Sequence, residues 1–148
     1  MLDIKGITLL LLLVLSVVSE KLYSQSNSLT IGSGVNPVQV IFKNKDSIRV
    51  ENIQDKVNIA ISSTKGLRFE IKQFLINQLK CGKLVYGKNF QLVLFQNSQK
   101  FESKPNDYKN SIGIVCTDKN AYKLYVKGLL YNGHEHVKIR AQLNVKIE

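Results

Sequence analysis

Hydrophobic and polar residues alternate most strictly near the C-terminal end of the chain. From Val137 to Ile147 every odd-numbered residue is apolar, and every even-numbered residue is polar or charged. A period of two places alternate side chains on opposite faces of a β-strand. A similar alternation runs from Tyr122 to Leu130, and an Asn-Gly pair, the strongest short signal for a two-residue hairpin turn, lies between the two segments. The C-terminal segment therefore predicts a β-hairpin with one buried and one exposed face.

The turn also predicts how the two strands pair. If Tyr131 pairs with His134 across the Asn-Gly turn, the apolar side chains of both strands share one face. The facing pairs on the other side are then Lys127 with Lys138 and Tyr125 with Arg140. That exposed face is strongly cationic, and its residues are Lys123, Tyr125, Lys127, His134, His136, Lys138 and Arg140.

Shorter alternating segments upstream predict further strands. They cover residues 38–43, 48–53, 57–61, 84–86, 90–95 and 112–116, with turns at 44–46 and 118–120. Residues 84–86 and 90–95 are interpreted as a hairpin, and the polar segment Gln96 to Asn110 as a long loop, which is a natural place for a binding surface. Roughly eight short strands at regular spacing predict an all-β fold, a two-sheet antiparallel β-sandwich of immunoglobulin-like type.

Residues 67–80 carry two periods at once. Leu67, Phe69 and Ile71 alternate as in a strand, whereas Leu67, Ile71 and Phe74 recur at helical spacing. We expect a strand to about Ile71 followed by a short helix or helical turn at 72–80, where helix-favouring residues predominate. If all of 67–80 is helical, the fold class becomes α+β.

The N-terminal segment has the pattern of a secretory signal peptide. Lys5 precedes an almost wholly apolar stretch from Ile7 to Val18, and small residues suited to cleavage follow at Ser19 and Ser24. A bilayer span needs about 20 apolar residues, so the stretch is too short to cross comfortably, although an uncleaved anchor is the alternative. We expect residues 1–24 to be the signal and 25–148 to be one secreted domain, located in a periplasm, at a cell surface or outside the cell, with no integral membrane segment.

The chain contains two cysteines, Cys81 and Cys116. A secretory route favours a disulfide bond between them. The alternative, a reactive thiol pair, would need the closer Cys-x-x-Cys spacing.

The charge balance favours acidic partners. Lys and Arg number 21 against 11 Asp and Glu, which gives a net charge of +10. Such a surplus suits an acidic glycan, a lipid headgroup or a nucleic acid, and the alternative is solubility alone. Aromatic rings interleaved with cations add stacking to charge, as binding surfaces for polyanions do. The candidate anion-binding residues are Lys123, Tyr125, Lys127, Lys138 and Arg140, with Tyr131 and Tyr108 as further rings; the alternative is an ordinary solvated strand face.

Little in the sequence indicates catalysis. Gly-x-Ser-x-Gly, a phosphate-binding glycine loop and His-Glu-x-x-His are all missing, and the carboxylates are scattered. His134 and His136 would point the same way from a strand, but no third or fourth metal ligand accompanies them. We expect no enzyme, no metal and no cofactor.

The two ends of the chain resemble the subunits of bacterial fimbriae that a chaperone and an usher assemble. The resemblance rests on the signal, the domain size, the predicted disulfide and the alternating last strand after Gly133. It implies a structural or adhesive subunit whose edge strands bind a chaperone or a neighbouring subunit, with Ser28 to Phe42 as the strand donated to the neighbour. The cysteines in the second half of the chain, and Ile147 in place of the family's common penultimate Tyr, depart from that pattern. The alternative function is a monomeric basic binding module for an acidic glycan, lipid headgroup or nucleic acid.

Overall fold

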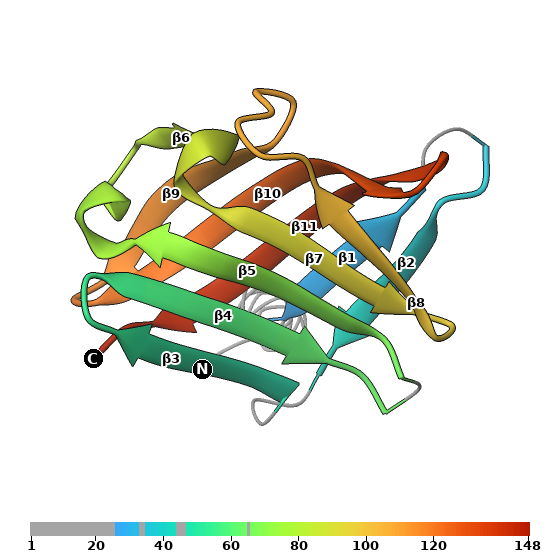
Figure 1. The fold of residues 1–148 in the computed structure, drawn as a ribbon. Coiled ribbons are helices and arrows are strands. Elements are labelled where there is room, and N and C mark those ends of the chain that lie inside the picture. Colours follow the sequence, from blue (N-terminus) through green and yellow to red (C-terminus); the bar gives the residue numbers. More distant parts are fainter. Residues whose placement is uncertain (1–25, 33–34, 44–46, 65) are drawn as a thin grey trace, which may run out of the picture.

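The computed structural model describes residues 26–32, 35–43, 47–64 and 66–148 (Figure 1). The predicted signal peptide at 1–24 and the predicted turn at 44–46 lie outside these residues. Within the described part of the chain, strands are joined by turns and by short 3-10 segments at Ile76–Gln78 and Gly87–Asn89, with no α-helix. The prediction of an all-β protein is confirmed.

The described strands form one 11-stranded sheet in which neighbours are antiparallel. Its order is β2-β1-β11-β10-β8-β7-β5-β4-β3, while β9 pairs with β10 next to β8 and β6 pairs with β9. The strands are β1 (Asn27–Ile31), β2 (Val38–Phe42), β3 (Ile48–Ile53), β4 (Lys56–Ser62), β5 (Arg68–Leu75), β6 (Leu84–Tyr86), β7 (Gln91–Gln96), β8 (Gln99–Ser103), β9 (Ser111–Asp118), β10 (Ala121–Asn132) and β11 (Glu135–Lys146).

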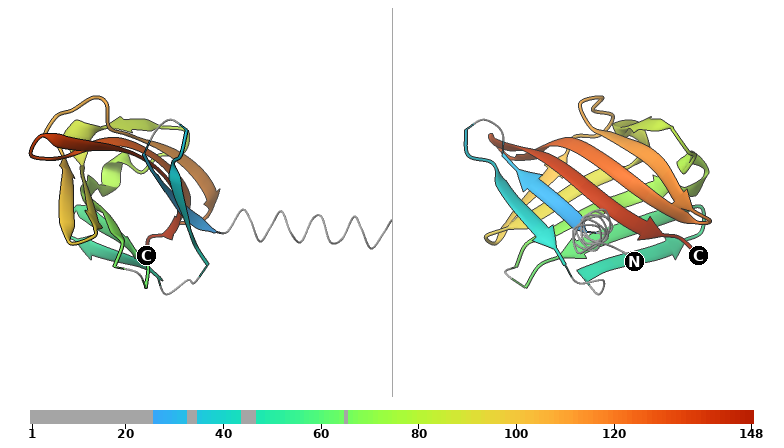
Figure 2. Two further views of the ribbon diagram at one scale, coloured as in Figure 1. Left: turned by 90° about the vertical axis from the view of Figure 1, so that its right-hand side faces the viewer. Right: turned by 180° about the vertical axis from the view of Figure 1, so that it is seen from behind.

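The sheet curls into a half-barrel, which the end-on view in Figure 2 shows. Its two limbs face each other, and β3 comes close to the end of the chain, where Asn52 donates a hydrogen bond of 2.8 Å to the carbonyl oxygen of Glu148. The two-sheet sandwich is not confirmed, because β8 pairs with β7 on one side and with β10 on the other and so joins both limbs into one sheet.

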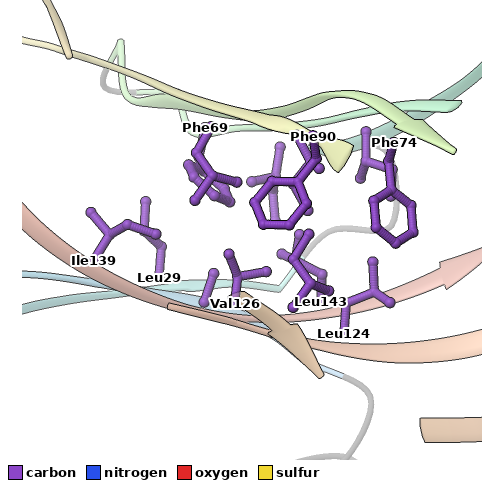
Figure 3. Packing of buried hydrophobic residues seen from close by; sticks show 14 of the residues in the cluster. Leu29, Phe69, Phe74, Phe90, Leu124, Val126, Ile139 and Leu143 are labelled. Atoms are coloured by element: carbon purple, nitrogen blue, oxygen red, sulfur yellow. The ribbon is translucent and has the colours of Figure 1, made fainter. Parts of the chain in front are cut away.

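The core fills the inside of the curl. In Figure 3, Phe69, Phe74 and Phe90 on one side face Leu124 and Leu143 on the other. All five side chains are buried. For Leu124 on β10 and Leu143 on β11, the alternation of apolar and polar residues predicts this burial.

Within 67–80, β5 runs with a bulge from Arg68 to Leu75, and a single 3-10 turn follows at Ile76–Gln78. The fully helical alternative is therefore wrong, and of the expected helix or helical turn at 72–80 only this turn is present. Val57 pairs with Phe74 and Ile59 with Ile71, so between these pairs one residue of β4, Asn58, lies opposite two of β5, Lys72 and Gln73. Gln73 has φ 57° at this bulge. The extra residue turns Phe74 back to the core face. Ile71 and Phe74 therefore share a face at a spacing of three, which imitates the spacing of a helix.

Two further predictions about pairing are wrong. Residues 84–86 and 90–95 do not form a hairpin, because β6 pairs with β9 whereas β7 pairs with β5 and β8. The expected loop from Gln96 to Asn110 contains β8, which turns back from β7 through Asn97 and Ser98, both with positive φ. Phe101 is the one large apolar residue of β8, so the strand shows almost no hydrophobic alternation.

The β10–β11 hairpin forms with a register two residues away from the predicted one. Asn132 pairs with Glu135, so Gly133 and His134 occupy the turn, and the positive φ of 60° falls on Gly133. Glycine at the first central position is typical of a type II′ turn. A shift of two keeps every side chain on its predicted face but changes its partner: Lys127 lies opposite Arg140.

The predicted disulfide is confirmed. Cys81 and Cys116 are joined with an S–S distance of 1.95 Å, and the bond ties the segment after β5 to β9.

Buried polar side chains complete the hydrogen bonding where two strand ladders end. Asn27 Oδ1 accepts the N–H of Asn144 at 2.7 Å beyond the β1–β11 pairing, and Ser103 Oγ accepts the N–H of Leu92 at 2.9 Å where β8 leaves β7. An unpaired buried amide is costly, so these side chains stabilise the sheet at the ends of the two ladders.

Candidate anion-binding face

The outer face of β10 and β11 places cations side by side. Lys127 lies opposite Arg140, and Arg140 lies opposite Thr30 of β1. Lys138 precedes Arg140 by two residues on β11 and therefore points to the same face. All three cationic side chains are exposed.

A fourth cation, Lys109, comes from the loop between β8 and β9. It borders a hollow of about 500 Å³ together with the three cations of the hairpin. We call this feature the cationic hollow; its lining residues are Thr30, Gly32, Pro37, Lys109, Lys127, Gly128, Leu129, Lys138, Ile139 and Arg140. No carboxylate is among them, and the ion pairs between described residues include none of the four cations.

Asn110 fixes the loop that carries Lys109. Its side chain is fully buried, and Oδ1 accepts the N–H of Leu129 at 2.7 Å. Leu129 lies between the stretch of β10 that pairs with β9 and the stretch that pairs with β8. The backbone of Asn110 also accepts a hydrogen bond from Gly87 and donates one to the carbonyl oxygen of Asp107. The side chain of Asn110, which follows Lys109, therefore ties the loop to Leu129, a residue that lines the cationic hollow.

The electrostatics of the cationic hollow favour an anion. Like charges placed directly opposite each other across two strands destabilise the pairing, and Lys127 and Arg140 are such a pair. A bound sulfate, phosphate or carboxylate group would offset that repulsion through charge-assisted hydrogen bonds.

The structure gathers only part of the predicted site. Lys127, Lys138 and Arg140 line the cationic hollow, whereas Lys123 and Tyr125 lie outside it. Tyr125 is opposite Gln142 on the same face, and the side chain of Lys123 is partly buried further along β10. Sequence reasoning missed Lys109, because the contact between its loop and β10 depends on tertiary structure that no local pattern reports.

Tyr131 and the two histidines lie at or near the hairpin turn, whereas Tyr108 lies in the loop before β9 beside Tyr86. Lys104 Nζ is 4.1 Å from the ring centroid of Tyr131, a cation–π contact, and the ring of His136 is 6.2 Å from the same ring. Tyr131 is thus already in contact with a cation of its own chain. The described residues contain no cluster of three or more His, Cys, Asp or Glu that could hold a metal ion.

No protein-family model, curated protein or solved structure matches this chain. Nowhere in the described ranges is there a helix with the length and apolar character needed to cross a bilayer.

Proposed function

We propose that this protein is a secreted, non-enzymatic binding module that takes the anionic groups of a polyanion into the cationic hollow. One observation carries the proposal: four cations from three separate segments, the loop before β9 and the two strands of the hairpin, converge on one hollow without a lining carboxylate. A merely solvated strand face does not require a cation from a distant loop to join it.

The charge and the disulfide support this proposal from two directions. The net charge of +10 attracts polyanions over a distance that salt limits to about 8–10 Å at physiological ionic strength. The bond between Cys81 and Cys116 is typical of proteins in oxidising compartments, which agrees with the predicted signal peptide. A periplasm, a cell surface or the extracellular space is the location we propose.

The test compares two double variants of equal charge. Lys127→Gln with Arg140→Gln removes the opposed pair, and Lys80→Gln with Lys119→Gln removes two exposed lysines from the opposite end of the strands. Lys119 precedes β10, whose first residue is Ala121, and Lys127 lies about 20 Å beyond Ala121 along the strand at 3.3 Å per residue.

We expect the Lys127/Arg140 variant to elute from a heparin column at clearly lower salt than the control variant. Its melting temperature should stay the same or rise slightly, because surface substitutions usually change stability by less than about 0.5 kcal/mol and here a repulsion is removed. Equal elution of the two double variants would show that heparin responds to net charge alone, and the proposal would be wrong.

A second candidate function is assembly by β-strand addition, as in the fimbrial subunits that the chain ends resemble. Its support is that β2 is one end of the main strand order of the described sheet, and that Val38 and Ile41 on β2 are exposed. A free edge with apolar side chains is a surface for pairing with another chain or a chaperone. The expected donor segment, Ser28 to Phe42, forms β1 and β2 in its own sheet, where Leu29 is buried. Assembly would therefore use the free edge of β2.

Ile41→Lys tests this candidate, because a lysine on an edge strand hinders pairing with another sheet. We expect concentration-dependent association of the wild type in sedimentation velocity, weakened in the variant. A wild-type protein that stays monomeric at millimolar concentration would exclude self-assembly.

A further inference from the structure

An exposed apolar and aromatic surface lies directly beside the cationic hollow. On the outer face of β6, β9 and β10, Leu84 pairs with Gly113, and Gly113 pairs with Tyr125. Leu84 and Tyr125 are 51% and 45% exposed. Residues that pair directly across strands point to the same face. We call this surface the aromatic patch; its exposed residues are Leu84, Tyr86, Tyr108, Val115 and Tyr125.

The aromatic patch and the cationic hollow are continuous. Tyr86 pairs with Ser111, Ser111 with Lys127, and Lys127 with Arg140, so one row across the sheet runs from an aromatic ring to two cations. The row that contains Tyr125 is the next one along β10, about 7 Å away for two residues of a strand. From β6 to β1 this face spans four strand spacings, about 19 Å.

Gly113 leaves the aromatic patch open. It has no side chain between Leu84 and Tyr125, and an added Cβ would lie 3.8 Å from the Cβ of Tyr125, in ordinary contact. The rings of Tyr86 and Tyr108 lie with centroids 6.1 Å apart and an interplanar angle of 58°. These two rings are tilted toward each other and do not form parallel platforms for consecutive stacked bases.

We infer that the ligand is an acidic polysaccharide, bound in an extended form across both surfaces. The inference rests on the proposed function and adds the class of polymer to it. The apolar face of a sugar ring would pack on Leu84 and Tyr125, and sulfate or carboxylate groups of neighbouring units would bind Lys127 and Arg140. Tilted rings beside an aliphatic side chain suit the uneven apolar face of a sugar better than the flat stack of a nucleic acid. The disulfide points to oxidising compartments, where acidic glycans are abundant polyanions.

The test is calorimetric titration of the wild-type protein with heparin-derived oligosaccharides of increasing length. Oligothymidylates of matched charge and inorganic sulfate serve as comparisons. We expect affinity for the oligosaccharides to rise with length until both surfaces are covered, and to exceed that for the oligothymidylate of equal charge. Tyr125→Ala should weaken oligosaccharide binding about tenfold, near the low end of what loss of an aromatic ring costs when a nucleic-acid base stacks on it, without changing its salt dependence. Tyr125→Phe should retain binding.

The outcomes separate the two proposals. Tighter binding of the oligothymidylate, or full affinity of Tyr125→Ala for the oligosaccharide, overturns the polysaccharide inference while salt-dependent binding still supports the cationic hollow. Absence of salt-dependent binding to every polyanion overturns both proposals. Leu84→Ala is the second variant to use if Tyr125→Ala lowers the melting temperature, and the same weakening is expected of it.

Discussion

Replacing Asn110 by Ala should weaken both the fold and the cationic hollow. The change removes the oxygen that accepts the N–H of Leu129 at 2.7 Å. It also frees the loop that holds Lys109 next to β10. One substitution therefore tests whether a buried side chain positions a cation of the proposed binding site.

The cost can be worked out from the contacts that are lost. A partly buried amide left without an acceptor costs about 1–3 kcal/mol. The Nδ2 atom of Asn110 has no hydrogen-bond partner among the described residues, so its removal breaks no further bond. We expect a loss of about 2 kcal/mol in the free energy of unfolding, which lowers the melting temperature by roughly 6–8 °C for a domain of this size.

Asn27→Ala is the matched control. Asn27 is likewise buried and its Oδ1 accepts the N–H of Asn144 at 2.7 Å, but neither residue lines the cationic hollow. Urea denaturation and elution from a heparin column should show similar stability losses for the two variants and reduced retention for Asn110→Ala alone. Wild-type stability of Asn110→Ala, or an equal loss of retention in both variants, would refute the role assigned to the Asn110 side chain.

Two further predictions concern the framework around this loop. Gly87→Ala should cost about 1–3 kcal/mol in urea denaturation, because its Cβ would lie 2.5 Å from the carbonyl oxygen of Asp107 and the loop would have to shift; wild-type stability would contradict the close approach. Replacing Cys81 and Cys116 together by Ser opens a loop of 35 residues, which should cost about 4 kcal/mol in the chain-entropy model. A change below about 1 kcal/mol in the same assay would mean that the bond does not constrain the unfolded chain.

The sequence predicted those parts of the fold that have long, regular alternation. In β10 and β11 the period of two assigned each side chain to the correct face, including Lys127, Lys138 and Arg140. The predicted register was wrong by two residues, because Gly133 occupies the first central position of the hairpin turn. An even shift in register leaves every side chain on the same face of the sheet, so the alternation alone does not distinguish the two registers.

Other parts depend on tertiary contacts that a local pattern does not contain. The bulge at Gln73 imitates a helical spacing, and β8, with Phe101 as its one large apolar residue, has almost no alternation. The sandwich was predicted from the number and spacing of short strands, and these do not report that β8 pairs with both β7 and β10. Lys109 joins the site because Asn110 binds Leu129, and a hydrogen bond between a loop and a strand 19 residues away leaves no periodic signal.

The most direct measurement is the location of polyanion binding on the protein by NMR. Amide resonances of the ¹⁵N-labelled protein would be followed during titration with a heparin-derived oligosaccharide. The largest shifts should fall on residues that line the cationic hollow, Lys127, Leu129, Lys138 and Arg140, and shifts on β3, β4 and β5 should be small. Shifts centred on β3 to β5, or no saturable shifts at all, would contradict the assignment of the cationic hollow as the binding site.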